Sequence, residues 1–103
     1  MSWRLIASTG AIGTMHGVPT ISRFFGIVIT MYFDEHGVPH FHAERGEHAA
    51  VISIAPVELL AGSMPKRDLR LVLAWAQLHE AELLANWDRA RRSEKLEWIE
   101  PLR

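Results

Sequence analysis

The chain has 103 residues, which leaves room for one hydrophobic core and therefore one domain. Hydrophobic residues make up 49% and charged residues 22%, proportions that exclude a disordered chain, and no apolar run reaches the roughly 18 residues that a membrane span requires. The formal net charge is −1. Cysteine is absent, so the chain has no disulfide bond and no thiolate metal site, and we expect a cytoplasmic protein without a membrane partner.

Residues 1–18 are rich in Gly, Ser, Thr and Ala and follow no clear period. This composition predicts a loosely ordered N-terminal extension, followed by a single α+β domain over residues 19–103. Met15 lies four residues before Pro19, where the organised sequence begins, so translation could also start there.

Residues 24–33 carry large apolar side chains at every odd position. A period of two with β-branched and aromatic residues predicts one long, half-buried strand. Residues 34–39 follow with the composition of a turn, in which Gly37 can adopt a positive φ. The two segments together indicate the first half of a β-hairpin.

Residues 40–45 alternate again, with Phe41 and Ala43 on the face expected to meet the core. Residues 47–54 and 57–61 predict two further strands, separated by a turn. The sequence therefore predicts three to four antiparallel strands arranged as N-terminal hairpins.

Residues 66–92 contain neither Gly nor Pro, and apolar side chains recur every three or four positions. This spacing predicts a long C-terminal helix, or a helix pair if the chain breaks near His79. The first half is apolar on nearly all sides, so we expect two of its sides to be buried. Either the rest of the same chain buries both sides, or a second copy in a homodimer buries one of them. We expect residues 93–103 to run back over the core.

The residues able to carry out chemistry gather in one predicted hairpin: Tyr32, Asp34, His36, His40, His42 and Glu44. If Phe33 and Phe41 both face the core, antiparallel pairing sets Tyr32 opposite His42 and Asp34 opposite His40, with Cβ atoms about 4.5–5.5 Å apart. Two imidazoles and a carboxylate at such distances suit metal binding, acid–base catalysis or contact with a partner. Solvated strand residues without a function are the fourth interpretation.

We expect no bound metal and no cofactor. Only His40, His42 and Asp34 are well-placed ligands, whereas structural zinc normally has four and a catalytic site needs three with an ordered second shell. His36 lies beside Gly37 in the turn, where its direction is unconstrained. The sequence contains no phosphate-binding loop.

Charge is distributed unevenly along the chain. Residues 19–62 carry two arginines against five acidic residues, whereas residues 63–92 carry six basic residues against four acidic ones. Contact with a nucleic acid should therefore involve the C-terminal half, although a solvated helix face explains the same residues.

Two motifs, Pro-Thr-Ile-Ser-Arg-Phe at 19–24 and Pro-His-Phe-His-Ala at 39–43, resemble those of the small bacterial family known as domain of unknown function 4160. The similarity extends to residue 102 and leaves residues 1–18 outside the family pattern. Genes of this family often lie beside a second small domain of unknown function, and some members are described as toxins of two-gene toxin–antitoxin modules. The resemblance implies that role but supplies no established catalytic residues.

We therefore expect a toxin that acts on RNA and is neutralised by a small antitoxin-like partner. His40 and His42 would be acid and base, with Arg23 and Tyr32 as phosphate contacts and Asp34 holding one imidazole tautomer. The alternative is a non-enzymatic interaction module that binds the neighbouring small protein. The sequence alone does not decide whether the chain is an enzyme.

Overall fold

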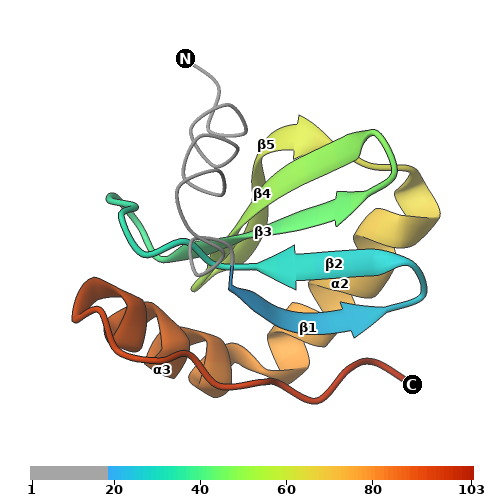
Figure 1. Ribbon diagram of the computed structural model, residues 1–103. Helices are drawn as coiled ribbons and strands as arrows, with labels where there is room; N and C mark the ends of the chain where they lie inside the picture. The colour runs from blue at the N-terminus through green and yellow to red at the C-terminus, as the bar shows by residue number, and fades with distance from the viewer. Residues whose placement is uncertain (1–18) are drawn as a thin grey trace.

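The computed structural model describes residues 19–103, which form a five-stranded antiparallel sheet followed by two helices (Figure 1). The strands are β1 (Thr20–Phe24), β2 (Ile27–Thr30), β3 (His40–Arg45), β4 (His48–Ile54) and β5 (Val57–Ser63). Their order across the sheet is their order along the chain, so every strand pairs with its neighbours in sequence. The α+β class is confirmed, while the predicted extension over 1–18 lies outside the described residues.

The prediction of one strand over residues 24–33 is wrong. The chain turns at Phe25 and Gly26, whose φ angles are 50° and 80°, and β1 and β2 pair as a hairpin. Phe24 and Ile27 are partners across this two-residue turn and are both buried. Phe25 is apolar but 54% exposed, so it continued the alternating pattern through the turn and concealed it. The sheet has five strands rather than three or four for this reason.

The predicted helical segment is a pair of helices, α2 (Lys66–Leu78) and α3 (Glu80–Arg91). The break is at His79, whose φ of −117° and ψ of 28° end the first helix and begin the second. The helix-pair alternative is thus confirmed. Neither helix is long and apolar enough to cross a membrane.

The core lies between one face of the sheet and α2, which passes behind β1 and β2 in Figure 1. Trp75 of α2 is fully buried, and its ring lies 5.3 Å from that of Phe24 and 5.8 Å from that of Phe41. Phe41 pairs with Ile52 on β4, and both are fully buried. The expected core face of the 40–45 strand is confirmed.

The C-terminal segment runs back alongside β1, as predicted (Figure 1). The Ile99 amide donates to the carbonyl of Ile21 at 2.8 Å, and the Ser22 hydroxyl donates to the carbonyl of Ile99 at 2.9 Å. The Trp75 indole donates to the Glu100 carbonyl at 2.8 Å. Hydrogen bonds to the backbone of the tail therefore hold it along one edge of the core.

Candidate functional site

The two histidines of β3 lie where the chain enters the sheet after a nine-residue loop, residues 31–39, that follows β2. Thr30, not Tyr32, pairs with His42, because β2 ends at Thr30. The predicted pairing is therefore displaced by two residues. A displacement of two leaves every side chain on its original face, so the alternating pattern cannot distinguish the two registers.

Glu35 supplies the carboxylate of the site. Its Oε1 atom lies 2.8 Å from Nε2 of His40 and 2.5 Å from Nε2 of His42. Asp34, the predicted carboxylate, is exposed. We call Glu35, His40 and His42 the histidine–carboxylate cluster. Glu35 was missed because it precedes the strand in a loop, where alternation carries no information about direction.

Both imidazole rings of the cluster are held by packing. The ring of Tyr32 lies edge-on to His42 at 4.7 Å, and the ring of Trp87 from α3 lies 5.0 Å from that of His40. His42 is 1% exposed and His40 9%. Tyr32 therefore lies beside the cluster, and its role as a phosphate contact stays a prediction. Trp87 was missed because it lies far along the sequence on α3.

His40 faces an acceptor oxygen at each ring nitrogen. Nδ1 lies 2.8 Å from the carbonyl oxygen of Val38, and Nε2 faces the Glu35 carboxylate. Neither oxygen can donate, so both hydrogen bonds form together only when the ring carries two protons. Burial lowers the pKa of His40, but the hydrogen bonds and charge of Glu35, together with the Val38 carbonyl, outweigh burial and raise it.

The carboxyl group of Glu35 shows the complementary effect. Burial raises its pKa, but hydrogen bonds from His40 and His42 outweigh burial and lower the pKa to about 2. An ionised carboxylate thus lies between two imidazoles at neutral pH. Its side chain is 21% exposed and that of His40 11%, so solvent reaches both side chains.

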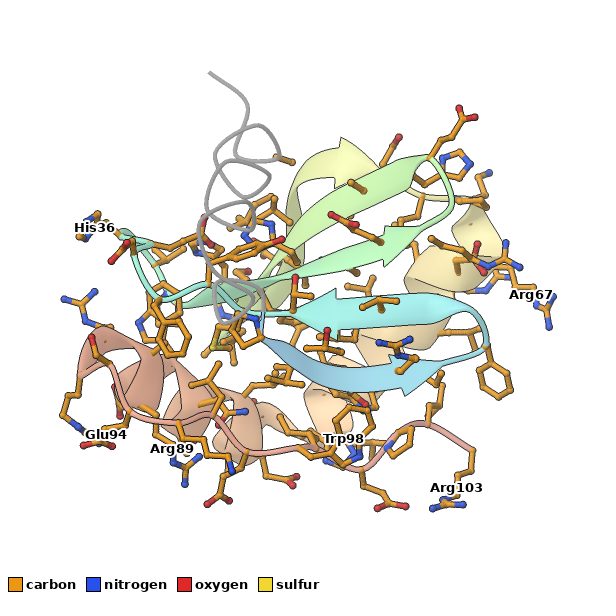
Figure 2. All side chains as sticks on the ribbon, in the orientation of Figure 1. His36, Arg67, Arg89, Glu94, Trp98 and Arg103 are labelled. Carbon is orange, nitrogen blue, oxygen red and sulfur yellow. The ribbon has the colours of Figure 1, made fainter. Side chains whose placement is uncertain are left out.

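Arg23, a predicted phosphate contact, and His36, considered as a further metal ligand, do not belong to the cluster. Arg23 is exposed on β1 and shares the sheet face of His42, because Arg23 pairs with Val28 and Val28 with Glu44. His36 is exposed at the outer end of the loop and points away from the sheet (Figure 2). His36 therefore does not complete the cluster.

Basic residues of the helical region are spread out. Figure 2 shows Arg67 and Arg89 on opposite sides of the molecule. Arg67 lies at the start of α2, and Arg89 lies in the last turn of α3. These two side chains cannot contact the same phosphate, and contact between a nucleic acid and the C-terminal half stays a prediction.

Within the described part of the chain, the cluster is a group of three potential metal ligands, whose ligand atoms all lie within 4.8 Å of one another. Two imidazole nitrogens and a carboxylate oxygen are chemically suited to proton transfer and to binding a divalent transition metal. The geometry is thus compatible with two of the predicted functions, acid–base catalysis and metal binding, with Glu35 in place of Asp34 as the carboxylate.

Residues 26–88 match the family described as "Domain of unknown function (DUF4160)". The matched segment covers more than half of the chain and includes the whole histidine–carboxylate cluster together with Trp87. No curated protein and no solved structure matches the chain. The function must therefore be argued from the site.

Proposed function

We propose that this chain, which belongs to the DUF4160 family, is the toxin of a two-gene toxin–antitoxin module and acts on RNA at the histidine–carboxylate cluster. One observation carries the choice of site: a single carboxylate oxygen of Glu35 lies within hydrogen-bonding distance of both β3 histidines. The resemblance of the two sequence motifs to a family with members described as toxins supports the biological role.

His40 and His42 remain the proposed catalytic residues, and Glu35 takes the place given to Asp34. RNA offers a phosphodiester and a neighbouring 2′-hydroxyl, and imidazoles with a carboxylate are groups that can act on both. Tyr32, beside His42, and Arg23, on the same sheet face, are the proposed phosphate contacts. A phosphate would approach from the loop side, where Glu35 and His40 are partly exposed.

Neutralisation by a small antitoxin-like protein in the cytoplasm completes the proposal. Covering the loop of residues 31–39 and the adjoining His40 would be sufficient, because Glu35 and His40 are the partly exposed members of the cluster. A partner bound in this way would block the site without unfolding the domain.

Induced expression in a bacterial host tests the proposal. Wild-type protein should arrest growth and shorten cellular RNA, and the His40→Ala, His42→Ala double variant should relieve both effects. His48→Ala is the matched control, because His48 is an exposed β4 residue that is not part of the cluster. Normal growth with abundant, folded wild-type protein would refute the proposed function.

The second candidate, a non-enzymatic interaction module, is favoured by the outer edge of the sheet. β5 is an edge strand, and its residues Leu59 and Leu60 are 40% and 47% exposed. An unpaired edge with apolar side chains can accept a strand from a neighbouring small protein or a second copy. This function requires a stable complex without RNA turnover, and Leu60→Lys should weaken the complex while the double histidine variant should not.

A further inference from the structure

We infer that Glu35, His40 and His42 together bind one divalent transition-metal ion of the zinc class. The inference deepens the proposed function, since it names the ion that the same site would use, and it relies on that function only for the reaction with RNA. It replaces the expectation that the chain holds no metal, which was based on the small number of ligands and on the ordered second shell that a three-ligand site requires.

The donor atoms match the chemistry of such an ion. Imidazole nitrogen favours zinc, iron, nickel and copper over magnesium and calcium, which prefer oxygen ligands alone. Two histidines with one carboxylate are a known ligand set of catalytic zinc and of non-haem iron. The cluster contains this set on one short loop and one strand.

An ion would fit between the three donor atoms after a small movement of the Glu35 carboxylate. With bonds of about 2.0–2.1 Å, ligand atoms around a tetrahedral ion lie roughly 3.3 Å apart. Oε1 of Glu35 lies 2.8 Å and 2.5 Å from the two Nε2 atoms, where hydrogens now lie between them. Glu35 belongs to the loop of residues 31–39, so its carboxylate can withdraw by under about 1 Å without disturbing a strand.

The second shell of His40 is already formed. A metal-bound histidine usually donates its other ring N–H to a carbonyl or carboxylate, which fixes the ring and its tautomer. Nδ1 of His40 lies 2.8 Å from the Val38 carbonyl, and the rings of Trp87 and Tyr32 hold the two imidazoles in place. His40 can therefore bind an ion through Nε2 without losing its bond to Val38.

A bound ion would also leave room for a substrate. Both ring nitrogens of His40 are directed at protein oxygens when no ion is bound. Three protein ligands around an ion leave a fourth position for water or a substrate oxygen. The partial exposure of Glu35 places that position on the solvent side of the cluster.

Zinc titration of the full chain, made without an affinity tag and stripped with a chelator, tests the inference. We expect one Zn²⁺ per chain in competition with a chromophoric chelator, and a visible Co²⁺ spectrum typical of four-coordinate sites. Glu35→Gln should weaken Zn²⁺ binding at least about tenfold, because losing a ligand should cost no less than losing a second-shell partner. Asp34→Asn, which changes the adjacent exposed carboxylate, should leave affinity unchanged.

Failure of the inference is separable from failure of the proposed function. Wild-type protein that binds no Zn²⁺, or a folded Glu35→Gln variant that binds it as tightly as wild type, would overturn the metal site even if expression arrests growth. If Glu35→Gln does not fold by circular dichroism, the wild-type Co²⁺ spectrum decides, and the absence of a four-coordinate spectrum overturns the inference. One bound Zn²⁺ in a protein that is harmless on expression would refute only the toxin role.

Discussion

Glu35 and His40 stabilise each other as an ion pair in the metal-free protein. The pKa of Glu35 is lowered from its ordinary value of 4.5 to about 2, and the pKa of His40 is raised above its ordinary value of 6.5. Such shifts link the protonation of these groups to the stability of the fold. The pair therefore has a defined pH range in which it stabilises the protein most.

We predict that this contribution is greatest between pH 4.5 and 6.5. Glu35 stabilises the fold fully above 4.5 and loses its contribution as pH falls through about 2, whereas His40 stabilises it fully below 6.5 and loses its contribution as pH rises through its raised pKa. Glu35→Gln should flatten both limbs when urea unfolding is measured against pH with a chelator present. A Glu35→Gln curve parallel to that of wild type would contradict the pairing, and Glu94→Gln, on the exposed tail, is the control.

At the residue scale, the sequence predicted the kinds of group in the site but not which carboxylate it contains. His40 and His42 were identifiable because they alternate with buried Phe41 and Ala43 on a strand. The choice between Asp34 and Glu35 depends on how the loop folds back over β3, and no periodic pattern reports that.

At the scale of elements, the hairpin between β4 and β5 depends on a close backbone approach. Gly62 has a φ of 78° and pairs with Ala50, and a Cβ atom added there would overlap the carbonyl oxygen of Ala49. Gly46, in the β3–β4 turn, has a φ of 58°, and nothing lies within 4 Å of an added Cβ. A substitution at Gly46 therefore measures the free-energy cost of a positive φ alone, whereas one at Gly62 adds the cost of a steric clash.

We predict that Gly46→Ala lowers the free energy of unfolding by about 1–2 kcal/mol, the usual cost of a left-handed non-glycine residue. Gly62→Ala should cost more, on the order of 3 kcal/mol or above, since the β4–β5 pairing must also shift. Urea unfolding of both variants measures the difference. Equal losses would show that β5 moves away from Ala49 without cost.

Asn86 anchors the C-terminal segment to α3. Its side-chain amide donates to the Glu97 carbonyl and accepts from the Glu97 amide, each at 2.9 Å, and it is fully buried. We predict that Asn86→Ala costs about 1–3 kcal/mol, because the Glu97 backbone groups lose their partners. Hydrogen exchange at the Ile99 amide should also accelerate, whereas Lys95→Ala, an exposed tail change, should leave it unaltered. Unchanged exchange in Asn86→Ala would mean that the bonds to β1 and to Trp75 hold the tail without Asn86.

Elements with strong periodicity were predicted well, and their ends were not. The helical segment follows from apolar spacing, which left open whether it is one helix or a pair that breaks near His79. The return of the tail was also expected. The turn at Phe25 and Gly26 was missed because an exposed phenylalanine resembles a core residue in sequence.

At the scale of the whole molecule, the cluster joins parts of the chain that only the tertiary fold brings together. The 31–39 loop supplies the carboxylate, β3 supplies the imidazoles, and α3 supplies Trp87 against His40. The break between α2 and α3 is what allows α3 to bring Trp87 to the ring of His40. The α+β class and the helical region were predictable, but this convergence was not, because contacts across such sequence distances leave no local pattern.

The growth of cultures expressing Glu35→Gln or Asp34→Asn is the most direct test that the histidine–carboxylate cluster is the working site. The two variants change adjacent carboxylates by the same chemistry, and only Glu35 contacts the histidines. At matched levels of soluble protein, Asp34→Asn should arrest growth as wild type does, and Glu35→Gln should allow growth. Growth arrest by a folded Glu35→Gln variant equal to that by wild type would contradict the account.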